Sequence, residues 1–212
     1  MPILPFAYRS FQQHLFPVAI ALVTIFIALA GPEVQQELRY ERSSVFAGEP
    51  WRLITAHFVH LSWGHLLMNL AALGLVWGLA WHTLRLSTWL GISITSMLSV
   101  SLGLFMFNPE LEWYVGLSGM LHGLFLAGIV ANLAATSIYE LWTARENHRL
   151  EIVLLLALCG KVAWEQIYGP LPGSAEFAGG AVIVDAHFYG LVGGLMGVLP
   201  YILLKRNHKP AK

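Results

Sequence analysis

A serine among glycines is the residue best suited to chemistry in this chain. Ser118 is followed by Gly119 and preceded, two positions earlier, by Gly116, at the start of a long apolar run. A serine that opens a helix is commonly an N-cap. The same position offers unpaired backbone N–H groups, which suit a developing oxyanion. Serine becomes a nucleophile only when a base removes its proton, so the rest of the chain must supply that base.

Two histidines could be this base. His122 lies one helical turn after Ser118, whereas His187 opens a later apolar run that contains Gly190 and Gly194. The Gly-x-x-x-Gly spacing lets two helix backbones approach closely, which is what a histidine on another helix needs to reach the serine. We therefore favour His187 as the base. We expect the ring of His122 to pack beside His187, because a residue one turn along the same helix flanks the serine.

The residues around this pair suggest a dyad with an oxyanion hole. Asp185 is two residues from His187 and on a different helical face, and no other acidic residue is clearly placed to orient the ring. We therefore expect a Ser–His dyad. His65 and Asn69 share one helix face and could donate to an oxyanion together with the backbone N–H of Ser118. The competing interpretation is that these two side chains hydrogen-bond across a helix bundle.

Three histidines near residue 60 also suggest a metal site. His57, His60 and His65 are separated by three and five residues, which places them on a bend rather than on one helix face. The chain has no His-Glu-x-x-His pattern, the usual arrangement of zinc ligands on a helix. We therefore expect no metal and no other cofactor.

Membrane helices must position these residues. The 212 residues are 57% hydrophobic and 11% charged, whereas a soluble domain carries about 25% charge. The formal net charge of zero argues against a nucleic-acid partner. The pattern predicts one all-α membrane domain over residues 1–212. Its helices are expected at about 11–30, 62–81, 86–107, 117–138, 150–167 and 185–204.

Two connections are long enough to have a function. Residues 33–56 are polar and contain Trp51 and Arg52, which we expect at the membrane interface, with the arginine charge reaching water. Residues 168–184 are rich in glycine, and we expect them to move aside for a substrate. Within the first helix, Pro17 should lie near the start, where proline is tolerated.

Six spans place both ends of the chain on one side of the membrane. Eight of the twelve Lys and Arg residues fall on that side: Arg9, Arg85, Arg145, Arg149, Lys205, Arg206, Lys209 and Lys212. By the positive-inside rule both termini are cytoplasmic. Ser118, His187, His65 and Asn69 would then all lie near the outer ends of their helices.

With these residues in this order, the sequence resembles the rhomboid family of intramembrane serine proteases. The matching segments are residues 51–52, 60, 65–69, 116–119 and 186–190, together with Gly194. The resemblance implies a six-transmembrane-helix rhomboid bundle, with Ser118 as nucleophile and His187 as base. It also implies His65 and Asn69 as oxyanion donors. Cleavage would fall in or near a substrate's transmembrane segment, at small residues that destabilise its helix.

One position narrows the resemblance. Many rhomboids have a tyrosine four residues after the serine, stacked on the catalytic histidine, whereas this chain has His122. Residues 116–123 look like the rhombosortase branch. That branch implies an enzyme of the bacterial inner membrane that removes a glycine-rich C-terminal sorting tail from a single-pass membrane protein.

Three other functions remain open. The first is a rhomboid protease with other single-pass substrates, and the second is a non-catalytic rhomboid-like protein that binds membrane helices. The third is a small transporter or channel, since intramembrane histidine and asparagine suit a proton path.

Overall fold

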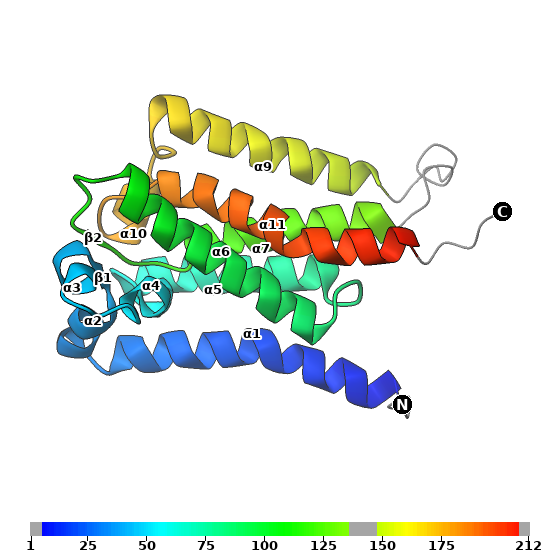
Figure 1. Ribbon diagram of the computed structural model, residues 1–212, viewed down its shortest axis with the longest axis horizontal. Helices are drawn as coiled ribbons and strands as arrows, with labels where there is room; N and C mark the ends of the chain where they lie inside the picture. The colour runs from blue at the N-terminus through cyan, green and yellow to red at the C-terminus, as the bar shows by residue number, and fades with distance from the viewer. Residues whose placement is uncertain (1–5, 136–147, 208–212) are drawn as a thin grey trace.

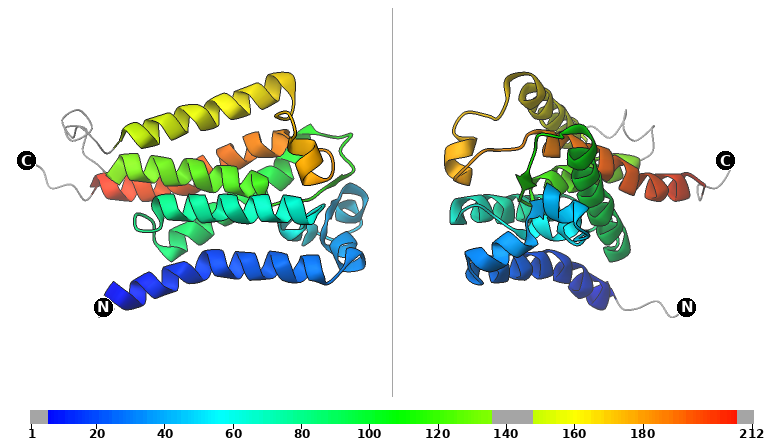
Figure 2. Two further views of the ribbon diagram at one scale, coloured as in Figure 1. Left: turned by 180° about the vertical axis from the view of Figure 1, so that it is seen from behind. Right: turned by 60° about the vertical axis from the view of Figure 1, so that its left-hand side comes forward.

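The computed structural model describes residues 6–135 and 148–207, and its side chains from 14 to 135 and from 148 to 205. Six long helices form the body of the described chain (Figure 1). They are α1 (Phe6–Leu29), α5 (Trp63–Ala80), α6 (Leu86–Phe107), α7 (Ser118–Ala135), α9 (Arg149–Tyr168) and α11 (Asp185–Asn207). α1 begins and α11 ends at the same end of this bundle. Figure 2 shows α1 along one edge of the bundle and α9 along the opposite edge.

Each helix expected from the hydrophobic pattern is present. α1 begins at Phe6 rather than near residue 11, so Pro17 lies inside the helix. The expectation that this proline lies near the helix start is therefore wrong. Membrane helices tolerate an interior proline where neighbouring groups satisfy the freed backbone. Residues 136–138, the expected end of the fourth helix, lie outside the described residues.

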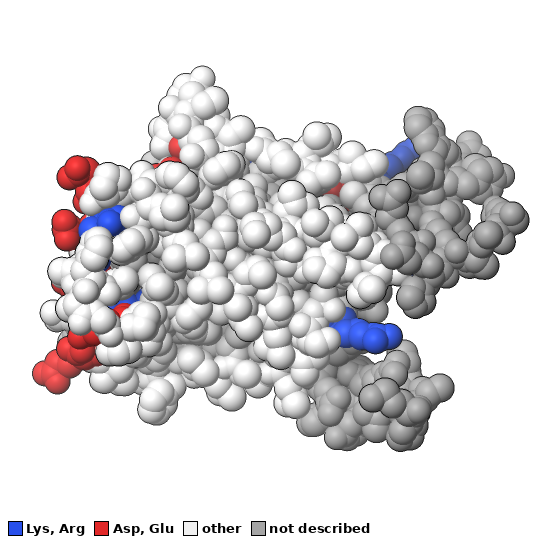
Figure 3. Space-filling model, in the orientation of Figure 1, with Lys and Arg blue, Asp and Glu red and all other residues white. Residues whose placement is uncertain are grey.

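Within the part of the chain that the structure describes, four helices are long and apolar enough to cross a membrane: α5, α6, α7 and α11 as far as Lys205. α1 contributes a shorter apolar segment, His14–Leu29. α9 is more charged, because it carries Arg149, Glu151, Lys161 and Glu165. Figure 3 shows charged side chains gathered mainly toward the two ends of the molecule, with a broad uncharged surface between them. The predicted all-α membrane bundle is thus confirmed.

Glycines on α11 bring this helix close to its neighbours. A Cβ atom on Gly190 would collide with the backbone carbonyl oxygen of Gly119 on α7, and one on Gly194 with that of Gly123. On another face of α11, a Cβ on Gly193 would lie 2.5 Å from a backbone carbonyl oxygen of α6. At all three glycines the nearest atom is a backbone carbonyl oxygen of the neighbouring helix. A side chain at any of these positions would therefore push the helices apart.

This packing predicts that Gly190→Ala destabilises the protein by about 1–3 kcal/mol, the usual cost of overpacking. Gly78→Ala on α5 is the matched control, because a Cβ there meets nothing within 4 Å. That variant should unfold at the wild-type temperature or slightly above it, since alanine favours helix by about 1 kcal/mol over glycine. Thermal unfolding in detergent measures both, and equal midpoints for the two variants would contradict the packing argument.

The chain between α1 and α5 folds into short elements at the end of the bundle opposite the start of α1 (Figure 1). These are α2 (Pro32–Leu38), β1 (Tyr40–Glu41), α3 (Arg42–Phe46), α4 (Arg52–Thr55) and the 3-10 helix η1 (Ala56–Phe58). β1 pairs antiparallel with β2 (Trp113–Tyr114), which precedes α7. The sequence predicted only a polar connection here, because elements this short leave no periodic pattern.

Arg52 is buried in this outer layer, with 4% of its surface exposed. Its guanidinium donates to the carbonyl oxygens of Gln36 at 2.7 Å and Arg39 at 3.1 Å. It also pairs with the carboxylates of Glu37 and Glu49. The expectation that this arginine reaches out to water is therefore wrong. Its five N–H donors instead tie together segments of the outer layer, while the preceding tryptophan is half-exposed.

The glycine-rich connection packs on the start of α5. It contains α10 (Ser174–Ala178), which is flanked by Gly173 and Gly179, both with positive φ. The Ser62 hydroxyl donates to the carbonyl oxygen of Ala178 at 2.9 Å. This contact places the connection next to the starts of α5 and α7, because Ala178 also lines the cavity that contains Ser118.

Candidate active site

The structure brings Ser118 and His187 into contact. Ser118 opens α7, and His187 lies in the first turn of α11. Nε2 of His187 is 3.1 Å from Oγ of Ser118, and the histidine is 4% exposed. The close approach of Gly119 to Gly190 explains this distance, because each glycine lies within one turn of one of the two side chains.

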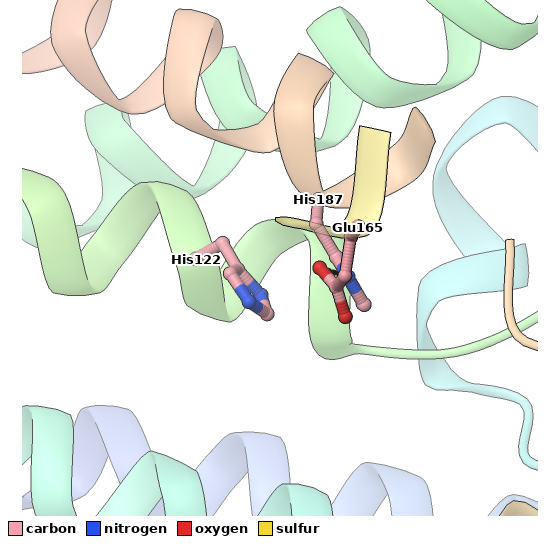
Figure 4. Close-up of side chains that lie close together, drawn as sticks. All are labelled: His122, Glu165 and His187. Atoms are coloured by element: carbon pink, nitrogen blue, oxygen red, sulfur yellow. Dashed lines mark hydrogen bonds and ion pairs between the residues drawn. The ribbon is translucent and has the colours of Figure 1, made fainter. Parts of the chain in front are cut away.

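Glu165 contacts the other nitrogen of the same ring. Its Oε2 lies 2.8 Å from Nδ1 of His187, and the residue is 3% exposed (Figure 4). A carboxylate only accepts hydrogen bonds, so Nδ1 carries the proton and Nε2 presents a lone pair to Ser118. The expectation that no acidic residue orients His187 is therefore wrong. Asp185 has another role, since it accepts a hydrogen bond from Asn108 at 2.5 Å.

His122 packs flat against His187. The ring centroids are 4.1 Å apart and the planes differ by 17°. Nδ1 of His122 lies 2.7 Å from the carbonyl oxygen of Ser118, and Nε2 lies 3.0 Å from Nζ of Lys161. The carbonyl only accepts and the ammonium only donates, so the proton of His122 is on Nδ1. Both of its nitrogens are engaged away from the Ser118 hydroxyl, so the geometry favours His187 as the base.

Lys161 places its ammonium among the side chains of Glu165, His122 and His187. Nζ is 2.7 Å from Oε1 of Glu165, 3.0 Å from Nε2 of His122 and 3.5 Å from Nδ1 of His187. Ligand atoms of these three residues all lie within 4.8 Å of one another, which is close enough to hold a metal ion. The lysine ammonium already supplies a positive charge to this set. Lys161 was not among the site residues predicted from the sequence.

His65 and Asn69 lie in the first half of α5. The backbone N–H of Leu61 donates to Nδ1 of His65 at 3.4 Å, so Nε2 carries the proton. His65 lines the same cavity as Ser118. Asn69 is buried and donates from Nδ2 to the carbonyl oxygen of His65 at 3.1 Å. The structure therefore brings His65 to the cavity, whereas Asn69 is not among the residues that line it.

Hydrogen bonds to both the N–H and the carbonyl group of Gly116 hold the backbone just before Ser118. Gly116 has φ +124°, a conformation that residues with a side chain rarely adopt. Its N–H donates to the carbonyl oxygen of Ala56 at 3.0 Å, and its carbonyl accepts from the hydroxyl of Tyr114 at 2.9 Å. Burial raises the pKa of Tyr114, which keeps this hydroxyl protonated as a donor. Sequence reasoning missed Tyr114, because its role depends on the backbone turn.

A cavity of about 320 Å³ opens over Ser118. Its apolar walls include Leu61 and Val182, the latter from the glycine-rich connection, and Glu110 and Glu112 add carboxylates from the loop before α7. Ser118 and His65 are both among the lining residues, so a short extended segment of another chain bound in this cavity would lie beside the serine.

The three histidines near residue 60 have different surroundings in the described part of the chain. Nε2 of His57 lies 3.1 Å from the carbonyl oxygen of Met97, and burial lowers the pKa of this histidine to about 4. The ring of His60 lies edge-on to His65, with centroids 4.9 Å apart. Burial, and secondly His65, lower the pKa of His60 to about 3. Both rings therefore stay neutral near pH 7.

Residues 47–206 match the family model of the Rhomboid domain. This range contains every residue of the cluster around Ser118. A search of curated proteins finds no matching sequence. Because the family model covers well over half of the chain, the protein belongs to the rhomboid family, whose members are generally intramembrane serine proteases.

Proposed function

We propose that this protein is an intramembrane serine endopeptidase in which Ser118 is the nucleophile, His187 the general base and Glu165 the group that orients the base. One observation carries the proposal. A continuous chain of polar contacts runs from Oγ of Ser118 through the ring of His187 to Glu165, with distances of 3.1 and 2.8 Å. The three residues come from α7, α11 and α9, so the tertiary fold alone brings them together.

The reaction follows from this geometry. Oγ of Ser118 attacks the scissile carbonyl carbon while its proton passes to Nε2 of His187. Glu165 stabilises the resulting imidazolium through Nδ1–H. The C–N bond then breaks, and His187 returns the proton to the leaving amine, which leaves an acyl-enzyme on Ser118. Water, deprotonated by the same nitrogen, releases the second product and restores the serine.

We propose three donors for the oxyanion that forms when Ser118 attacks. The backbone N–H of Ser118 belongs to the first turn of α7, where N–H groups have no intrahelical partner. The second is Nε2–H of His65, a residue that lines the same cavity as the serine. The amide of Asn69 has two N–H groups, and one is enough for its bond to the His65 carbonyl. Loss of one such donor typically lowers kcat by about 10²- to 10³-fold.

The substrate is a membrane protein, as in the family at large. A transmembrane helix hides its carbonyl groups in hydrogen bonds, so the cut must fall where small residues let it unwind. We propose a rhombosortase substrate, a single-pass protein with a glycine-rich C-terminal tail. Support for this finer assignment comes from His122, which replaces the tyrosine found in many rhomboids and stacks on His187.

The proposed location is the bacterial inner membrane, with both termini cytoplasmic. Among the eight basic residues expected on the terminal side, the side chains of Arg85, Arg149 and Lys205 are described. They lie at the start of α6, the start of α9 and near the end of α11, which are all at the end where α1 begins. Ser118 would then face the outer side of the membrane.

Two matched substrates in proteoliposomes test the function. Both carry the same transmembrane helix and basic end, and in one the glycines of the tail are replaced by leucines. We expect wild-type protein to cut the glycine-rich substrate preferentially and Ser118→Ala to cut neither. Equal cutting of both would replace the sorting-tail assignment with a rhomboid protease of broader specificity. Folded wild-type protein that binds the substrates and cuts neither would overturn the protease assignment.

A further inference from the structure

A half-buried lysine and a buried glutamate form an ion pair on α9, beside the proposed catalytic histidine. Lys161 and Glu165 are four residues apart, which places them on one helix face, and Nζ lies 2.7 Å from Oε1. The glutamate side chain is 2% exposed and the lysine side chain 32%. An unpaired carboxylate at this depth would be very costly, so the lysine is the charge that permits Glu165 to be ionised there.

The same ammonium controls where His187 holds its proton. A buried carboxylate without a counter-charge would draw a second proton onto the adjacent ring, and Nε2 would then be protonated and unable to accept from Ser118. Lys161 opposes this in two ways. It neutralises Glu165, and its Nζ lies 3.5 Å from Nδ1 of His187, where it disfavours a second positive charge.

Lys161 also fixes the proton of His122. Its Nζ donates to Nε2 of that ring at 3.0 Å, which leaves the ring proton on Nδ1. Nδ1 lies 2.7 Å from the carbonyl oxygen of Ser118, so it donates to the backbone of the nucleophile. One ammonium thus specifies the proton position on two stacked rings.

Building on the proposed function, we propose that Lys161 is a positioning residue that keeps His187 as a free base and His122 as the Nδ1–H form. The groups that face His187 are Glu165 and Lys161 from α9, and Ser118 and His122 from α7. His65 on α5 is a further titratable group near this cluster, since it lines the same cavity as Ser118. Of these groups, only Lys161 is an amine that pairs directly with the Glu165 carboxylate.

The test compares Lys161→Met, which keeps the length of the side chain without its charge, with Lys161→Arg, which keeps a cation. Arg149→Met is the matched control, because it removes a cation from the other end of α9.

Cleavage of the glycine-rich substrate is followed in proteoliposomes from about pH 6 to about pH 9. At neutral pH, Lys161→Met should lower kcat by at least about tenfold with little change in KM, within the range of general-base effects. Its activity should recover as the pH rises, whereas Lys161→Arg and Arg149→Met should keep the wild-type profile.

Two outcomes would overturn the role of Lys161. One is a Lys161→Met profile that matches the wild type at every pH, and the other is activity lowered equally at every pH. In both cases, Ser118-dependent cleavage by the wild type would leave the protease assignment intact.

If Lys161→Met does not fold, nitrogen NMR of ¹⁵N-histidine in the wild type decides. A neutral His187 with Nδ1 protonated at pH 7 supports the proposal, and a doubly protonated ring contradicts it.

Discussion

Replacing His187 with alanine is expected to lower kcat for peptide cleavage by at least about 10⁴-fold, because Ser118 then has no group to accept its proton. His122→Phe should cost far less. Phenylalanine retains a flat ring against His187, while both nitrogens of His122 are already engaged by Lys161 and the Ser118 carbonyl. Initial rates with the glycine-rich substrate in proteoliposomes measure both variants.

Folding must be intact for this comparison to be meaningful. Thermal unfolding in detergent should give both variants midpoints close to the wild type, since each keeps the glycine contacts between α7 and α11. If His122→Phe proved inactive and His187→Ala retained activity, the base assignment would be reversed.

Glu165→Gln is expected to lower kcat by about 10³- to 10⁴-fold with little effect on KM, as the equivalent change does in serine proteases. The amide can donate to Nδ1 of His187, and the proton of the ring then moves to Nε2, where it blocks acceptance from Ser118. The substitution also removes the counter-ion of Lys161, whose Nζ lies 2.7 Å from the carboxylate.

Glu151→Gln is the matched control for this variant. It makes the same chemical change near the other end of α9, where the carboxylate lies 4.0 Å from His148. It should leave kcat at the wild-type value. Full activity of Glu165→Gln would show that the 2.8 Å contact with His187 has no part in the reaction.

The sequence predicted the long helices because apolar runs bounded by glycine, proline and charge leave a clear pattern. It also predicted the approach of α11 to α7, since Gly190 and Gly194 are spaced for close backbone contact. The short elements before α5 gave no such pattern. Arg52 was placed wrongly because its partners are backbone carbonyl groups that only the folded loop brings near.

Glu165 and Lys161 were missed for a different reason. They lie far from both Ser118 and His187 in the sequence, whereas Asp185, which is near His187 in the sequence, accepts a hydrogen bond from Asn108 instead. A signal was present. A lysine and a glutamate four residues apart inside an apolar run are costly in a membrane unless they are paired and used.

Fluorophosphonate labelling of the purified protein in detergent, read by mass spectrometry of its peptides, tests the central claim most directly. The account predicts one adduct on Ser118, absent in Ser118→Ala and formed much more slowly in both His187→Ala and Glu165→Gln. Folded wild-type protein that forms no adduct and leaves a helical substrate uncut would contradict it. So would an adduct on Ser118 that forms at the same rate without His187.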